Sequence, residues 1–222
     1  MEHIKTELTI IGTGMTGMAA ALFAANRGID TVLVGSTSEI MFASGFIDLL
    51  GVHPIQERKS WKNPWQGIAE VCRDIPKHPY ARIDEPDTRA AFDQTLSFLK
   101  EAGLPYFRRN EQNCKAVTSL GTLKSTYCIP QTMWAGVEAL GKKSSCLLVD
   151  FRGLKGFSAR QIAAVLQHQW PNLRTVRIPF PEMEHMEEVY TEALARNLSM
   201  EHNRVKLAEV IRPHVKGSVY VG

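Results

Sequence analysis

The sequence lacks the features that mark membrane-spanning, disulfide-linked or zinc-binding proteins. Its longest apolar run, Met18 to Ala25, has eight residues, whereas a membrane-spanning helix needs about 20. The four cysteines form no Cys-x-x-Cys pair and have no metal-ligand spacing with the seven histidines. Glycines interrupt the apolar residues of the N-terminus, unlike those of a signal peptide. We therefore expect a cytoplasmic protein with reduced thiols, no metal site and no membrane span of its own.

An excess of charge of one sign is also missing. The 222 residues include 26 basic and 23 acidic side chains, which give a net charge of +3. The densest basic clusters are the pairs Arg108-Arg109 and Lys142-Lys143, which fall short of the basic surface that binds nucleic acid. A hydrophobic content of 44% suffices for a sizeable core. The composition predicts a folded domain without a nucleic-acid partner.

One strong motif is present near the N-terminus, where a β-branched run changes into an alanine-rich run at three glycines. Leu8 to Ile11 predicts a strand, Met18 to Ala25 a helix, and Thr31 to Val34 a second buried strand. The first strand and the helix are joined by Gly12-Thr13-Gly14-Met15-Thr16-Gly17. This context makes the Gly-x-Gly-x-x-Gly pattern a predicted nucleotide-binding loop in a Rossmann-like α/β fold with parallel strands.

The three glycines have different predicted tasks. The first permits the tight turn, the second lets the backbone approach a pyrophosphate, and the third lets the helix pack close to the strand. The helix N-terminus supplies amide donors and a positive dipole to the phosphates. The alternative is a glycine turn that serves packing only.

The acidic residue that usually binds a ribose hydroxyl is missing. It is expected about 20 residues after the glycines, at the end of the second strand, where the sequence has Gly35 followed by Ser36. Glu39 comes four residues after Gly35 and would need a bent loop to reach the ribose. The residues therefore leave FAD, FMN and a nicotinamide nucleotide open.

A second candidate segment, Ala43 to Asp48, follows the second strand. Its small residues Ser44 and Gly45 can place amides and a hydroxyl against a flavin or its phosphates. The alternative is a loop that enters a helix with Ser44 as its cap.

The rest of the chain predicts a further α/β region. The proline-rich stretch from residue 53 to 86 is interpreted as irregular. A helix from about Thr88 to Gly103 has Thr88 as its cap, and residues 117–129 predict a hairpin around Gly121. The remaining expected elements are strands at 146–151, 173–178 and 218–221, a helix from Ser158 to about Trp170, and helices at about 186–198 and 201–211. Because nothing follows the last strand, we expect residues outside this chain to complete its sheet.

Several segments together resemble the B subunit of the anaerobic glycerol-3-phosphate dehydrogenase. They are the glycine loop, Ser44 to Leu50, His78-Pro79-Tyr80, the run Leu120-Gly121-Thr122-Leu123-Lys124-Ser125-Thr126, and the strand end Asp150-Phe151. The resemblance covers most of the chain, and the run from Leu120 to Thr126 is more specific than the glycine loop.

The resemblance implies an oxidoreductase flavoprotein that is usually associated with FMN, with FAD as the alternative. Its partners would be an FAD-containing A subunit, which oxidises glycerol 3-phosphate to dihydroxyacetone phosphate, and an iron–sulfur C subunit. The C subunit would anchor the complex to the membrane and pass electrons toward quinone in fumarate or nitrate respiration. The chain has about half of the family's usual length, so we expect its C-terminal part to be missing.

Under this resemblance, residues 1–74 are expected to begin the flavin-binding domain, and residues 75–222 to form a substrate-side or capping domain that is truncated at its end. Lys124 is a candidate cation near the flavin pyrimidine, and an exposed hairpin lysine is the alternative. Catalytic residues are not predicted. The expected cofactor-binding residues are Gly12, Thr13, Gly14, Met15, Thr16, Gly17, Gly35, Ser36, Ser44, Gly45 and Lys124.

Two other functions stay open at this stage. Gly35, in place of an acid, also suits a non-catalytic scaffold subunit with a vestigial nucleotide fold. The third possibility is an FAD-dependent oxidoreductase with another substrate. We expect weak flavin binding by this chain alone, because half of the pocket would be missing.

Overall fold

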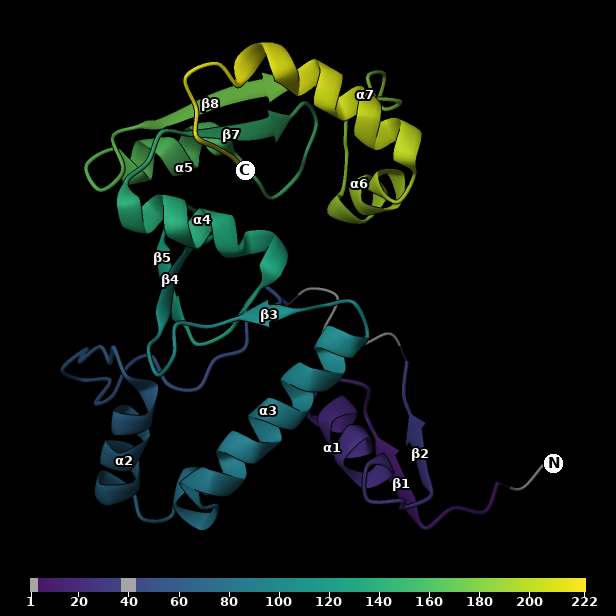
Figure 1. Cartoon of the computed structure of the whole chain (residues 1–222), viewed down its shortest axis with the longest axis vertical. Helices are drawn as coiled ribbons and strands as arrows, with labels where there is room; N and C mark the ends of the chain where they lie inside the picture. The colour runs from purple at the N-terminus through teal and green to yellow at the C-terminus, as the bar shows by residue number, and fades with distance from the viewer. Residues whose placement is uncertain (1–3, 37–42) are drawn as a thin grey trace. The chain divides into compact units, whose positions relative to one another are not determined.

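The computed structural model describes residues 4–36 and 43–222, and the chain divides into two compact units. Unit 1 comprises residues 1–114 and 126–131, and unit 2 comprises residues 115–125 and 132–222. Figure 1 labels most of the helices and strands of both units. The predicted division into a flavin-binding domain (residues 1–74) and a capping domain (residues 75–222) stays a prediction.

Unit 1 begins with the predicted strand–helix–strand unit. β1 (Leu8–Ile11) leads into α1 (Met15–Ala25), and β2 (Thr31–Val34) returns beside β1. The strands pair in parallel, with Leu8 opposite Thr31 and Ile11 opposite Val34 (Figure 1). The chain leaves α1 through Gly28, whose φ of 72° is readily adopted by glycine. The prediction of a parallel Rossmann-like start is confirmed.

The interpretation of residues 53–86 as irregular is wrong. This stretch contains α2 (Pro64–Asp74) and the 3₁₀ helix η2 (Pro79–Arg82). The side chain of Asn63 caps α2 by accepting hydrogen bonds from the amides of Trp65 and Gln66, at 2.9 and 3.3 Å. Pro64 occupies the first position of the helix, where its missing N–H is not needed. Pro64 and Pro79 therefore stand at the starts of helices, although a proline-rich stretch favours an irregular structure.

The helix predicted from Thr88 is present as α3 (Glu85–Glu101), but it begins earlier and has a different cap. Asp84 is the N-cap residue, and Thr88 lies inside the helix, where its hydroxyl donates to the Asp84 carbonyl at 3.2 Å. Pro86 stands in the first turn, a favoured place for proline. One face of α3 packs onto the core of unit 1 through Phe92 and Leu96; that core contains Leu49, Trp65, Ile68, Tyr127 and Cys128.

Short strands complete the middle of the chain. β3 (Tyr106–Phe107) pairs antiparallel with β6 (Ile129–Pro130). β4 (Cys114–Val117) pairs with β5 (Leu123–Thr126), and Gly121 between them has a φ of 82°. The predicted hairpin is thus confirmed. The helix that follows, α4 (Gln131–Lys142), is not predicted from the sequence.

Unit 2 contains a second parallel sheet. β7 (Cys146–Phe151), α5 (Ala159–Leu166) and β8 (Leu173–Ile178) form another strand–helix–strand unit, and β9 (Tyr220–Val221) pairs in parallel along the other edge of β7. The strand order is β8-β7-β9. The Ser158 hydroxyl accepts a hydrogen bond from the Gln161 amide at 3.3 Å, so the predicted helix begins at Ser158, which is its N-cap, and it ends at Leu166, before Trp170.

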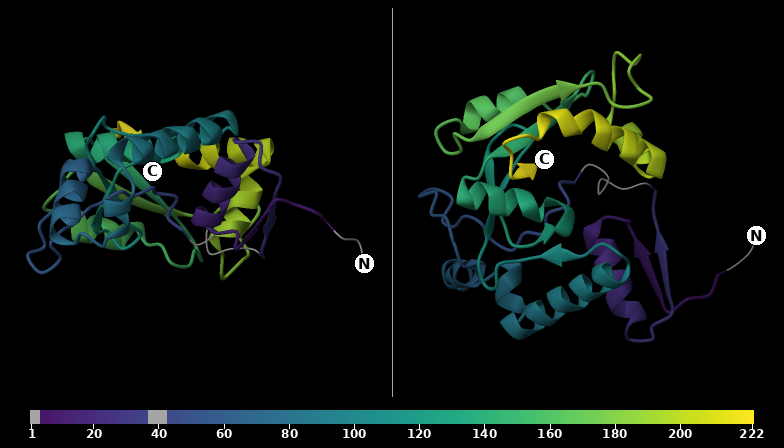
Figure 2. Two further views of the ribbon diagram at one scale, coloured as in Figure 1. Left: turned by 90° about the horizontal axis from the view of Figure 1, so that it is seen from below. Right: turned by 45° about the horizontal axis from the view of Figure 1, so that its top comes forward.

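This second sheet is covered on both faces. On one face Cys146 packs with Ile162 and Leu166 of α5. On the other, Leu147 and Val149 pack with apolar residues of α7 (Glu201–Ile211). Figure 2 shows α5 and α7 on opposite sides of the β7–β8 pair.

The remaining helices of unit 2 are α6 (Thr191–Leu198) and the 3₁₀ helix η3 (Arg212–His214). The predicted helix at 186–198 therefore begins later than expected. The reason is Val189, which is buried and forms a β-bridge with Leu154.

Candidate cofactor site

The glycine turn between β1 and α1 has the close packing that the sequence predicts. Gly12 has a φ of 111°, a left-handed conformation that glycine adopts without strain. A Cβ atom added to Gly17 would lie 1.9 Å from the Gly12 carbonyl oxygen. Because that oxygen belongs to the backbone, neither partner can move aside cheaply. Only glycine therefore fits at position 17.

The N-terminus of α1 is suited to an anion. Its N-cap residue is Gly14, which has no side chain that could accept the first amides, and its first turn has no acidic residue. A Cβ added to Gly12 or Gly14 would meet no atom of the described residues within 4 Å. The first-turn amides lack helical carbonyl partners, and the helix dipole adds positive potential there. The residues present thus fit the phosphate of a nucleotide or flavin, held by the amides of Met15, Thr16 and Gly17.

The end of β2 is packed against the same turn. The Thr13 hydroxyl donates to the Ser36 carbonyl oxygen at 2.5 Å. A Cβ added to Gly35 would lie 2.7 Å from Thr13 Cγ2 and 3.0 Å from its backbone nitrogen. Thr13 therefore fills the space in which an acidic side chain at position 35 would begin. Glu39, the nearest acid along the chain, lies outside the described residues.

The second candidate segment forms a loop. The Ser44 hydroxyl oxygen accepts a hydrogen bond from the Phe46 amide at 3.3 Å, and the Gly45 carbonyl accepts one from the Tyr106 hydroxyl at 2.7 Å. Ile47 then forms an antiparallel bridge with Cys128. The next helix of the described chain is α2, so the alternative in which Ser44 caps a helix is wrong. A contribution of Ser44 and Gly45 to a flavin site stays a prediction.

Lys124 lies on β5 in unit 2, and its side chain is half-buried. The glycine turn belongs to unit 1. A role for Lys124 beside the flavin therefore also stays a prediction.

The four cysteines are free, and three of them are poor nucleophiles. Burial raises the pKa of the Cys114 and Cys146 thiols, and it raises the pKa of Cys128 to about 12. A thiol that keeps its proton neither attacks an electrophile nor binds a metal. Across residues 4–36 and 43–222, no group of three or more His, Cys, Asp or Glu side chains is arranged to hold a metal ion.

The helices are short or polar relative to the thickness of a bilayer. Within the described ranges, none of them combines the length and the apolar character required to cross one.

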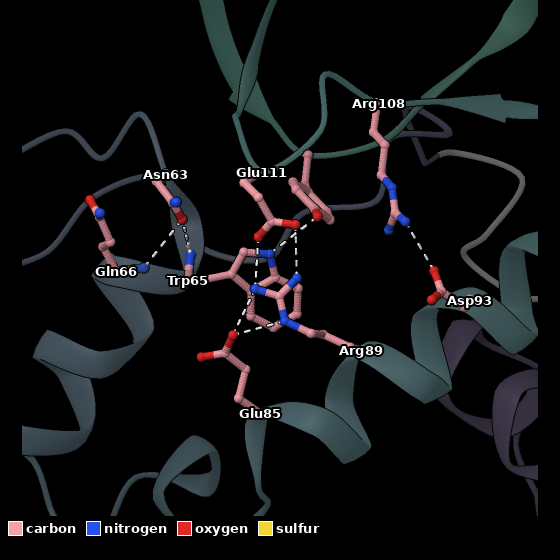
Figure 3. Close-up of polar contacts among 9 residues, drawn as sticks. Asn63, Trp65, Gln66, Glu85, Arg89, Asp93, Arg108 and Glu111 are labelled. Atoms are coloured by element: carbon pink, nitrogen blue, oxygen red, sulfur yellow. Dashed lines mark hydrogen bonds and ion pairs between the residues drawn. The ribbon is translucent and has the colours of Figure 1, made fainter.

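A cluster of charged and aromatic side chains around Arg89 of α3 was not predicted. Arg89 donates to both carboxylate oxygens of Glu111, at 2.9 and 2.7 Å, and to Glu85 at 2.8 Å (Figure 3). Its guanidinium lies 4.0 Å from the ring centroid of Trp65, a cation–π arrangement. The hydrogen bond from Arg89 lowers the pKa of Glu111, and the same bond raises the pKa of Arg89.

The hydrogen-bonding capacity of Arg89 is thus directed to protein carboxylates. We interpret the cluster as a structural connection between α3 and the bridge formed by Arg109 and Gln112. The part that sequence reasoning could have found is the Glu85–Arg89 pair, because its i,i+4 spacing suits an ion pair on a helix.

Comparisons with known proteins agree with this geometry. Residues 7–221 match the family model described as FAD binding domain. The anaerobic glycerol-3-phosphate dehydrogenase B subunit of Vibrio vulnificus (strain YJ016) is 35% identical over 126 residues, which cover 56% of this chain and 28% of that protein. The B subunit of Aliivibrio fischeri (strain MJ11) is 27% identical over 219 residues, which cover 93% of this chain and 48% of that protein. A probable B subunit of Halobacterium salinarum (strain ATCC 29341 / DSM 671 / R1) is 32% identical over 184 residues, which cover 80% of this chain and 40% of that protein.

No solved structure matches the chain significantly. The chain spans half or less of the length of these three curated relatives. The resemblance inferred from the motifs is confirmed by their names, and the Rossmann-like fold and the flavoprotein character are supported by the family match. This chain belongs to the FAD binding domain family, and its curated relatives described above are B subunits of anaerobic glycerol-3-phosphate dehydrogenases.

Proposed function

We propose that this chain is the flavin-binding part of the B subunit of an anaerobic glycerol-3-phosphate dehydrogenase. The observation that carries the proposal is the glycine turn, in which Gly17 packs against Gly12 and leaves the N-terminus of α1 open for a phosphate. The names of the relatives add the enzyme class. In this role the bound flavin supplies electron transfer, and the chain's own residues bind and orient it.

The flavin that we propose is FMN. An adenosine ribose is usually held by an acid at the end of β2, and here Thr13 fills that place against Gly35 and Ser36. FMN has a phosphate and no adenosine, so it does not require the missing contact. The first-turn amides of α1 would bind its phosphate, and Ser44, Gly45 and Lys124 would lie around the ring system.

The proposed partners follow from the same resemblance. The A subunit would oxidise glycerol 3-phosphate with its own FAD, and the iron–sulfur C subunit would pass electrons toward quinone at the cytoplasmic membrane. Residues 75–222 would form the capping domain, and the protein would associate with the membrane through its partner.

Cofactor analysis of the complete protein tests the proposal. The full-length protein, purified with its partners, should release FMN in a ratio of about one flavin per B subunit, identified by absorbance and mass. Release of FAD from the B subunit would contradict the choice of FMN. In the same complex, dye reduction that depends on glycerol 3-phosphate should fall when Gly17 is replaced by alanine. Gly136→Ala is the matched control, because a Cβ at Gly136 meets no described atom within 4 Å.

A second candidate function is a non-catalytic scaffold subunit. The packing of Thr13 onto Gly35 favours it, because the ribose-binding part of a dinucleotide site is filled by protein. If the B subunit of an active complex held almost no flavin, that result would support the scaffold and exclude electron transfer through this chain.

A further inference from the structure

A cavity of about 480 Å³ lies in unit 1 between α2, η2 and the start of α3. This volume is within the range of about 300–1,000 Å³ that is typical of small-molecule pockets. One face of α2 forms a wall with Ile68, Ala69 and Cys72, and Tyr80 of η2 forms another. None of these residues belongs to the glycine turn, so the cavity is separate from the proposed flavin site.

The two aromatic residues that line the cavity use their polar atoms elsewhere. The indole N–H of Trp65 donates to the Tyr127 hydroxyl at 3.1 Å, and the Tyr80 hydroxyl donates to the Leu49 carbonyl at 2.9 Å. Neither acceptor residue lines the cavity. Trp65 and Tyr80 therefore contribute their rings, which attract apolar groups. The Tyr80 ring can also attract a cation, whereas the Trp65 ring already has the Arg89 guanidinium 4.0 Å from its centroid.

The charged residues that line the cavity are both acidic. They are Asp84 and Glu85, and in the described part of the chain no lysine, arginine or histidine lines it. Arg89 holds the Glu85 carboxylate at 2.8 Å and so fixes its position. Asp84 is the N-cap residue of α3, but its side chain makes no capping hydrogen bond and no ion pair with any described residue. Among the described residues, the Asp84 carboxylate is therefore paired with no cationic side chain.

We propose that this cavity binds a small organic cation with an apolar body, of the arylalkylammonium class. The apolar part would pack against Ile68 and the aromatic rings, and the ammonium group would lie near Asp84 and Glu85. A neutral ligand would lack the Coulombic attraction to the carboxylates, and an anion would be repelled by them. The proposal assigns a role to Tyr80, a motif residue that the flavin function does not use, and it does not depend on the flavin function.

The test uses 2-phenylethylammonium as the probe and 2-phenylethanol as its neutral counterpart. Isothermal titration of the whole chain should show saturable binding of the ammonium ion, with a Kd on the order of 1 mM for a ligand this small. The alcohol should bind about fivefold more weakly. In a ¹H–¹⁵N correlation spectrum, the indole signal of Trp65 should shift on binding, while that of Trp170, in unit 2, should not.

Two variants separate charge from packing. Asp84→Asn should weaken binding of the ammonium ion about fivefold, and it should leave the fold intact, because Asp84 makes no capping hydrogen bond. Asp87→Asn is the matched control: it removes an equal charge from the first turn of α3 at a residue that does not line the cavity. Alkylation of Cys72, the one cysteine that is not fully buried, should abolish binding by filling the cavity.

Three results would each overturn the proposal. They are the absence of saturable binding, equal affinities for the ammonium ion and the alcohol, and an equal effect of the Asp84→Asn and Asp87→Asn substitutions.

Discussion

The two strand–helix–strand units of this protein have the same topology but begin their helices differently. In β1–α1–β2 the helix starts at Gly14, which offers no acceptor to the first amides. In β7–α5–β8 the Ser158 hydroxyl already accepts the Gln161 amide. The N-terminus of α1 is therefore suited to a phosphate, whereas that of α5 is capped by its own chain. The N-cap residue, Gly14 in α1 and Ser158 in α5, thus distinguishes the two helix starts.

The two strand–helix–strand units also differ in how deeply their apolar side chains are buried. Leu166 of α5 is 0% exposed, whereas Ile11 of β1 is 88% exposed and Val34 of β2 is 49% exposed. Parallel strands are usually covered on both faces, and of the two parallel sheets among the described residues only the β7 sheet meets that rule. The comparison predicts that the β7 sheet contributes more to the stability of its unit than the β1–β2 pair does.

The largest expected effect concerns this difference in burial. Leu166→Ala should lower the free energy of unfolding by about 2–5 kcal/mol, because it leaves a cavity in a fully buried site. Met18→Ala in α1, where the side chain is largely exposed, should change it by less than about 0.5 kcal/mol. Urea denaturation followed by circular dichroism measures both. Equal losses would contradict the comparison.

The second effect concerns the glycines of the two turns. In the complete protein, Gly17→Ala should weaken flavin binding at least about tenfold, because the added Cβ collides with the Gly12 carbonyl and displaces the start of α1. Gly156→Ala, in the turn before α5, should cost about 1 kcal/mol of stability because of its positive φ, and it should leave flavin affinity unchanged. Fluorescence titration with flavin separates the two outcomes.

The third effect comes from exchanging the two N-caps. Ser158→Ala should destabilise the protein by about 1 kcal/mol through loss of the cap. Gly14→Ser should stabilise it by a few tenths of a kcal/mol and weaken flavin binding, because the new hydroxyl competes with the phosphate for the same amides. If Gly14→Ser left flavin affinity unchanged, the phosphate site would not be at α1.

The smallest effect is a pH dependence of stability to which β7–α5–β8 contributes through Cys146, whereas β1–α1–β2 contains no cysteine. Burial raises the pKa of the Cys146 thiol, so the folded state holds this proton more tightly than the unfolded chain does. Its contribution to stability is complete below the unfolded thiol's pKa of about 8.5 and is lost as the pH rises through the folded value. The free energy of unfolding should therefore decrease as the pH rises above about 8.5, and less steeply in Cys146→Ala. An identical slope in that variant would show that Cys146 does not contribute.

The sequence predicted the parallel strands well and two helices poorly. β1, β2, β7 and β8 are β-branched or leucine-rich runs bounded by turn residues, so their ends could be located. α2 was missed because it lies in a proline-rich stretch that was interpreted as irregular. α4 was missed because its buried residues, Val137 and Ala139, do not form a regular helical stripe.

The candidate site was predictable only in part. The spacing of Gly12, Gly14 and Gly17 located the turn, because each glycine has a steric task that depends on local geometry. The contact between Thr13 and Gly35 joins residues from different elements, so no local pattern reveals it. The same holds for Arg89 and Glu111, which only the fold brings together.

The contact between Thr13 and Gly35 has a consequence for any change of cofactor preference. A glutamate introduced at position 35 to recognise a ribose would start 2.7 Å from the Thr13 methyl group, so this replacement alone should harm the turn. Trimming Thr13 to glycine first would remove the collision with its side chain and leave only its backbone nitrogen, at 3.0 Å, as a tight contact. Because the two sites are in contact, their effects should not add. A switch toward dinucleotide use in this chain would therefore require coordinated replacement of both residues, with the smaller side chain arriving before the larger one.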